Sequence, residues 1–194
     1  KTTMKKSLNI LFVAVVTSLF FACGSSNTDS VEQANDMNDK KDSSGSMMTI
    51  DDNDAKFLVE ASDASMMEIE AGNLAQQKST NKSVVDFGKM MSTEHANANT
   101  EIQSVASMKS VTMPTSMSED HMKKINDLRE KSGKDFDKDY MSMMVDGHKK
   151  VISDFEKMST DAKDDDIRAM SAKLLPTLRT HLEIAVKIED GLKK

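Results

Sequence analysis

Residues 84–105 read VVDFGKMMSTEHANANTEIQSV, and this stretch decides the fold. Its apolar and small residues recur every three or four positions, which is the spacing of one face of an α-helix. That face consists of Val84, Gly88, Met91, His95, Ala98, Ile102 and Val105. Because an ionisable side chain is costly to bury, His95 stands out on it. The pattern predicts an amphipathic helix that carries one histidine into a core.

Three other stretches repeat this pattern, each with one ionisable side chain in its apolar stripe: Glu68, His148 and His181. The stripes are Phe57, Ala61, Ala64, Glu68, Ala71 and Ala75; Phe136, Tyr140, Met144, His148, Val151, Phe155 and Met158; and Ile167, Met170, Leu174, Leu178, His181, Ala185, Ile188 and Leu192. A buried polar group needs a partner. Four such groups on four helices therefore indicate a common site.

The helical stripes and the lack of strand-like alternation predict an all-α fold, a four-helix bundle over residues 53–194. Two of the connections are short, whereas residues 111–133 separate the second long helix from the third. A short helix over 118–131 would let this segment return along the bundle, which is ferritin-like topology with a helical crossover between helices 2 and 3. In that arrangement Glu68 and the three histidines lie near mid-height.

Three imidazoles and one carboxylate are ordinary ligands for Zn²⁺, Fe²⁺ or Mn²⁺. One reading of the site is therefore a single divalent transition metal ion bound by Glu68, His95, His148 and His181, and the sequence leaves the cofactor open. Met91 and Met144 each precede a site histidine by one helical turn, and thioethers favour Cu(I), so copper is a less favoured choice. The sequence favours the other reading, a buried hydrogen-bonded network of Glu68 and the three histidines that fixes the register of the helices, and metal binding is the alternative to it.

The site lacks the carboxylates that bridge two irons in ferritin-like proteins, since Ser92 and Leu178 stand three residues before His95 and His181. Nucleophilic catalysis also lacks a motif in this sequence. We therefore expect a binding or stress-related module rather than an enzyme. A metal-dependent enzyme would need an open coordination position and a cleft beside the site.

The first residues have the pattern of an export signal. Lys5 and Lys6 precede an apolar run over residues 8–22, which is too short for a membrane span of about 20 residues. The run ends at Ala22-Cys23-Gly24-Ser25, which resembles a bacterial lipobox. We expect a signal peptide over 1–22 and a lipid on Cys23. That lipid would anchor an outer-membrane lipoprotein to the membrane in the cell envelope.

Residues 23–52 are rich in Ser, Asn, Asp and Lys, with scattered apolar side chains. Such a composition buries too little surface to offset chain entropy, so we expect a flexible linker here. The whole chain has a formal net charge of −6 and no Trp. It thus lacks the basic surface of a nucleic-acid binder, which excludes that class. His121, in the crossover beside Asp120, is expected to be a solvated surface residue.

Several segments, in this order along the chain, resemble domain-of-unknown-function family 4142. They are Phe57 to Ala75, Val85-Asp86-Phe87-Gly88-Lys89-Met90-Met91 with Glu94-His95, Asp135-Phe136-Asp137 with Tyr140, Asp146-Gly147-His148, and Leu175-Pro176 with His181. Members of that family are often labelled as predicted outer-membrane or putative membrane proteins. The resemblance covers about Asp54 to Leu192. It implies a ferritin-like bundle exported across the inner membrane, without an established enzymatic activity.

Overall fold

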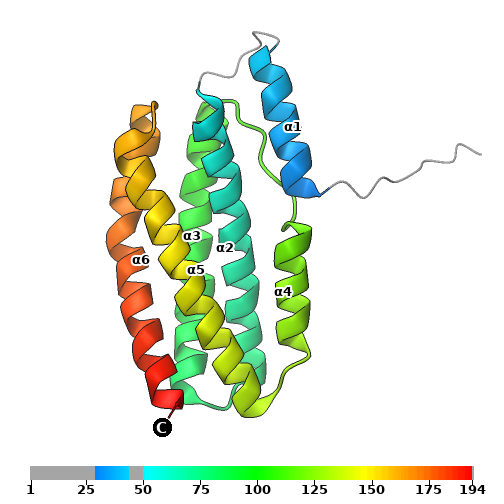
Figure 1. The fold of residues 1–194 in the computed structure, drawn as a ribbon, viewed down its shortest axis with the longest axis vertical. Helices are drawn as coiled ribbons and strands as arrows, with labels where there is room; N and C mark the ends of the chain where they lie inside the picture. Colours follow the sequence, from blue (N-terminus) through cyan, green and yellow to red (C-terminus); the bar gives the residue numbers. More distant parts are fainter. Residues whose placement is uncertain (1–28, 44–49, 194) are drawn as a thin grey trace, which may run out of the picture.

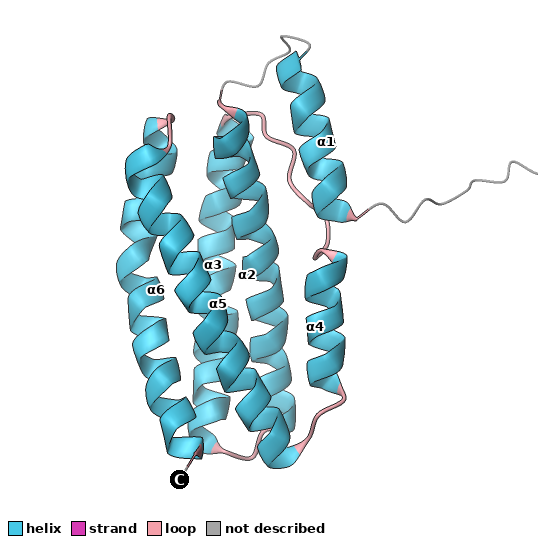
Figure 2. Cartoon of the chain, viewed as in Figure 1, coloured by secondary structure: helices cyan, strands magenta, loops and turns pink. Residues whose placement is uncertain are grey.

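The structure, a computed structural model, describes residues 29–43 and 50–193. Within these residues the fold is all-α and contains no strand (Figure 2). The helices are α1 (Ser30–Ser43), α2 (Asp52–Lys78), α3 (Lys82–Met108), α4 (Glu119–Arg129), α5 (Gly133–Asp161) and α6 (Asp165–Leu192). The predicted all-α bundle with a helical crossover is therefore confirmed, and the short helix predicted over 118–131 is α4.

Short polar caps set the beginnings of three long helices. The side chains of Asp51, Asn81 and Asp164 accept hydrogen bonds from free backbone N–H groups in the first turns of α2, α3 and α6. Residues 79–81 and 162–164 are the only links within the pairs α2–α3 and α5–α6. Such short links force each pair into an antiparallel hairpin.

The crossover places the two hairpins side by side. Lys109 at the end of α3 lies 2.7 Å from Asp164 at the beginning of α6, so both helix ends lie at the same end of the bundle. From there the chain returns along α2 through α4, and α5 begins at the opposite end (Figure 1). This is the ferritin-like order, in which α3 and α5 run in the same direction.

Two glycines let α2 and α3 approach closely. A Cβ at Gly72 would lie 2.5 Å from the carbonyl oxygen of Gly88, and a Cβ at Gly88 would lie 2.7 Å from Ala75 Cβ. Only glycine fits such a contact. Gly72 is one turn after Glu68, so this crossing holds Glu68 near α3.

The core consists of two apolar clusters with a polar layer between them. The upper cluster, toward the top of Figure 1, includes Phe57, Leu58, Ile102, Phe155, Ile167 and Leu178. The lower cluster includes Ala71, Phe87, Met91, Phe136, Tyr140, Met144 and Ala185. On each long helix the stripe passes from one cluster to the other at the ionisable residue. Glu68 and the three histidines therefore form the layer at mid-height, as predicted.

The segment predicted as a flexible linker contains a packed helix, so that prediction is wrong for residues 30–43. In α1, Ala34 joins the upper cluster. Asn38 donates to the Thr112 carbonyl at 3.0 Å and accepts from the Thr112 N–H at 2.7 Å. The crossover backbone has no helical partners there, and α1 satisfies it. These contacts are tertiary, so the local composition of residues 30–43 does not predict them.

The expected signal peptide, Cys23 and residues 44–49 of the linker lie outside the described residues. Among the described helices, none combines the length and apolar character that a membrane span requires.

Candidate metal centre

The structure brings together the four residues that the stripes single out. Glu68 contributes one carboxylate oxygen to each of two rings: Oε2 lies 2.8 Å from His95 Nδ1, and Oε1 lies 3.3 Å from His148 Nδ1. The rings of His95, His148 and His181 lie with their centroids 5.3 to 5.4 Å apart. All four side chains are buried. One residue from each long helix thus lies in one buried layer.

The hydrogen-bond partners fix the proton on two of the rings. His148 Nδ1 lies 2.9 Å from the Met144 carbonyl oxygen, which can only accept, so this nitrogen carries the proton. His181 Nε2 lies 2.8 Å from a carboxylate oxygen of Glu94 and carries the proton for the same reason. In neutral rings the remaining nitrogens, His148 Nε2 and His181 Nδ1, each present a lone pair. These two nitrogens lie 3.3 Å apart.

The third ring also has one nitrogen without a hydrogen-bond partner. His95 Nδ1 is held by Glu68, while His95 Nε2 is buried and has no hydrogen-bond partner. A buried polar atom without a partner costs about 1–3 kcal/mol of folding free energy, so each one needs an explanation. Each ring thus has one nitrogen held by a carboxylate or carbonyl oxygen and one nitrogen without such a partner, and one ligand nitrogen from each ring lies within 4.8 Å of the others.

The electrostatics of the layer follow from its burial and from Glu68. Burial raises the pKa of Glu68, but the neighbouring imidazoles, His95 first, lower it overall to about 2. Burial lowers the pKa of His95, and the Glu68 carboxylate more than offsets this, so the pKa rises. Burial dominates for His148 and His181 and lowers both pKa values. The last two rings are thus neutral, as ligands must be. The raised pKa of His95 favours its protonated form, so an ion bound at His95 Nε2 would displace a proton from that ring.

The spacing of the inward nitrogens suits one ion. One ligand atom from each of the three histidines lies within 4.8 Å of the others. Two nitrogens at about 2.0–2.1 Å from a tetrahedral Zn²⁺ are roughly 3.3 Å apart, which matches the distance between His148 Nε2 and His181 Nδ1. The outward partners supply what bound histidines ordinarily have, a carboxylate or carbonyl on the other ring nitrogen.

The structure gives the predicted residues different positions. The three histidines form the inner group. Glu68 lies behind them, because both of its oxygens accept from ring nitrogens rather than facing inward. Met91 and Met144 are buried in the lower cluster, and His148 contacts Met144 through the backbone carbonyl.

Glu94 is the site residue that the stripes do not reveal. It lies outside the apolar face of α3 and is half-exposed, yet it reaches His181 on α6. The acid next to a histidine in Glu94-His95 was the available signal, although adjacency on a helix does not show that the acid serves a different ring.

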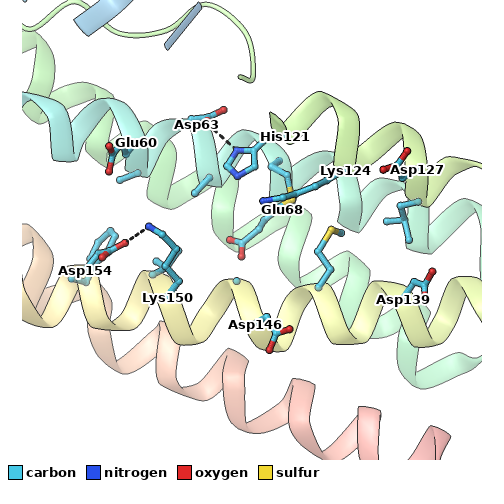
Figure 3. Close-up of a pocket in the computed structure, with 18 of the residues that line it drawn as sticks. Glu60, Asp63, Glu68, His121, Lys124, Asp127, Asp139, Asp146, Lys150 and Asp154 are labelled. Carbon is cyan, nitrogen blue, oxygen red and sulfur yellow. Dashed lines mark hydrogen bonds and ion pairs between the residues drawn. The ribbon is translucent and has the colours of Figure 1, made fainter. Parts of the chain in front are cut away.

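Two cavities adjoin the layer from different sides. The larger, about 750 Å³, lies between α2, α4 and α5 and has Glu68 at its floor. Figure 3 shows this cavity, with the Glu68 carboxylate pointing into it beneath a rim that includes Lys124, Lys150 and Asp154. None of the three inner histidines lines it. The smaller cavity, about 430 Å³, is lined by His95, His181 and Glu94.

A second histidine–carboxylate contact ties α4 to α2. His121 Nδ1 lies 2.9 Å from Asp63 Oδ2, and the His121 side chain is 19% exposed (Figure 3). The expectation of a solvated surface residue is therefore wrong. Asp63 Oδ1 also accepts from the backbone N–H of Ser118, the cap of α4. The pair anchors the beginning of α4 and lies apart from the layer of inner histidines.

Fold and layer together define a ferritin-like helical bundle with a buried histidine cluster. A family model described as a domain of unknown function (DUF4142) matches residues 39–188. The chain belongs to this family, as the resemblance in its sequence indicated. No curated protein and no solved structure matches the chain.

Proposed function

We propose that this protein binds one divalent transition metal ion through His95 Nε2, His148 Nε2 and His181 Nδ1. The observation that carries the proposal is the set of three buried inward nitrogens, two of them 3.3 Å apart and the third without any partner. A metal ion between these nitrogens would accept their lone pairs, which would otherwise repel one another.

A proton is the competing cation, and it accounts for less of the geometry. A proton on His95 Nε2, which the raised pKa of that ring favours, has no hydrogen-bond acceptor in this geometry. A proton shared between His148 and His181 would satisfy those two nitrogens and still leave His95 Nε2 buried and unpaired. A metal ion accepts lone pairs from all three rings at once. The hydrogen-bonded network and the metal site therefore share the same outward contacts and differ in what occupies the centre.

The donor set favours Zn²⁺ over Cu(I). Neutral imidazoles suit zinc and other borderline divalent ions, whereas Cu(I) favours thioethers. The side chains of Met91 and Met144 pack in the lower cluster, so nothing in the layer points to a soft ligand. Glu68 and Glu94 would orient the rings and raise their basicity from behind.

Metal analysis of the purified full chain, dialysed against Zn²⁺ and then against buffer, tests the proposal. We expect one zinc per chain, and its loss in His95→Gln, His148→Gln and His181→Gln. The matched control is His121→Gln, which removes a largely buried histidine outside the layer and should retain the metal. Equal zinc content in His95→Gln and His121→Gln would mean that the layer is only a hydrogen-bonded network.

We further propose that the protein acts in the cell envelope, held to a membrane by a lipid on Cys23. The support is the sequence alone: two lysines, an apolar run over residues 8–22, and a cysteine after Ala22. Expression of Cys23→Ser, followed by separation of membrane and soluble fractions, tests this. The variant should be soluble or unprocessed, and membrane partitioning with wild-type processing would contradict the anchor.

A further inference from the structure

We infer that the bound metal keeps one coordination position open, and that this position takes water or a small monoanion from the cavity lined by His95, His181 and Glu94. The inference rests on the proposed metal site. It assigns that site to the catalytic type of centre, which has three protein ligands and one exchangeable ligand, rather than to the closed structural type.

No fourth His, Cys, Asp or Glu side chain joins the three rings within the described residues. The group of His, Cys, Asp and Glu ligand atoms that lie together there consists of the three histidines. The two nearby carboxylates are engaged elsewhere, Glu68 with His95 and His148, and Glu94 with His181 Nε2 at 2.8 Å. A four-coordinate ion held by these rings would therefore carry one ligand that the protein does not supply.

The open side faces the smaller cavity. Two of the three histidines line this space, whereas the larger cavity reaches the layer only at Glu68. Its wall on α3 includes Ala98, the residue one turn after His95, and its wall on α6 includes Thr177, one turn before His181. Short side chains at these two positions leave a passage from the surface to the rings.

The chemistry of the cavity selects the ligand. Three neutral imidazoles leave the charge of the ion uncompensated among its direct ligands, so the open position favours water or a small anionic lone-pair donor. The acids on the cavity wall have partners of their own: Glu94 contacts His181, and Glu101 pairs with Lys173 at 2.9 Å. A volume of about 430 Å³ admits a small molecule but not a folded chain or a polymer.

Azide titration of the Co²⁺-loaded full chain tests this inference, because the visible spectrum of Co²⁺ reports its coordination. We expect one Co²⁺ per chain and a saturable spectral change with azide. Ala98→Phe should keep the Co²⁺ and weaken azide binding about tenfold or more by filling the cavity. Ala96→Phe is the matched control, since Ala96 is exposed on the same helix and does not line the cavity.

Each outcome has a separate meaning. If Co²⁺ binds at one per chain and azide leaves its spectrum unchanged, the site is closed, and the metal proposal stands without the open position. If Co²⁺ does not bind, the proposed function and this inference both fail. If azide binds equally to Ala98→Phe and wild type, the open side does not face this cavity. Should Ala98→Phe fail to fold by circular dichroism, Thr177→Phe narrows the same cavity from α6.

Discussion

Two histidine–carboxylate groups hold α2 to its neighbours, and they differ in how deeply they are buried and in how many rings each carboxylate meets. Between α2 and α4, Asp63 meets the single ring of His121 at 2.9 Å near the surface. In the mid-bundle layer, Glu68 meets two rings, and the inward nitrogen of His95 has no partner. A single histidine–carboxylate contact such as that of His121 and Asp63 ties two helices together. A layer whose outward contacts are satisfied and whose inward nitrogens converge has the form of a ligand site.

The largest expected effect is on stability without metal, from replacing each carboxylate by its amide. In chelator, Glu68→Gln should lower the free energy of unfolding by about 3–5 kcal/mol. A carboxamide has one acceptor oxygen and no charge, so one of the two rings loses its carboxylate partner. If the NH₂ group faces His148 it opposes a proton that the Met144 carbonyl fixes, and if it faces His95 that buried ring has to change tautomer.

Asp63→Asn should cost only about 1 kcal/mol, because its oxygen can still accept from Ser118 N–H and the His121 ring can change tautomer. Urea unfolding followed by circular dichroism measures both changes. Similar losses in the two variants would mean that the buried layer is no more demanding than the half-buried pair.

The next effect is stabilisation by metal. A ligand that binds only the folded state adds about 2.7 kcal/mol to the free energy of unfolding at a hundredfold excess over Kd. Wild type and His121→Gln should gain this amount when Zn²⁺ replaces chelator, and His95→Gln should gain nothing. Thermal unfolding at fixed Zn²⁺ concentrations measures the gain. A gain in His95→Gln equal to that of wild type would place the zinc elsewhere.

A smaller effect appears in the dependence of stability on pH. Because the pKa of Glu68 is lowered to about 2 in the folded state, its contribution is present above the unfolded pKa near 4.5 and is lost as pH falls toward 2. In chelator, the gap in unfolding free energy between wild type and Glu68→Gln should shrink by about 1.4 kcal/mol per pH unit in that window. The measurement is urea unfolding of both proteins from pH 6 to pH 3, and a gap that stays constant would mean that Glu68 is not ionised in the fold.

Periodicity predicted much of the fold and the layer. The four stripes identified every residue of the layer because a buried ionisable group interrupts an apolar face at the same height on each helix. Periodicity could not predict which way each side chain points within the layer. It placed Glu68 among the ligands, whereas the structure places it behind the rings.

The other features that the sequence did not predict have one physical cause, which is contact between segments distant in sequence. The helix α1 has a polar composition, and what holds it is the crossover backbone near Thr112, 74 residues away. Glu94 reaches a ring 87 residues away on α6. His121 looks solvated until α4 lies against α2. No local pattern reports such pairings.

The smallest expected effect concerns His121 itself, and it sharpens the contrast between the two groups. His121→Ala removes one contact from a half-buried pair, so it should lower the free energy of unfolding by about 1 kcal/mol or less. Asp63 keeps its hydrogen bond from the Ser118 N–H, which leaves the cap of α4 in place. Zinc content should be unchanged, since no inner ring contacts α4 among the described hydrogen bonds and ion pairs. Urea unfolding and metal analysis of His121→Ala check both statements, and a loss of zinc in this variant would show that α4 supports the metal site from outside the layer.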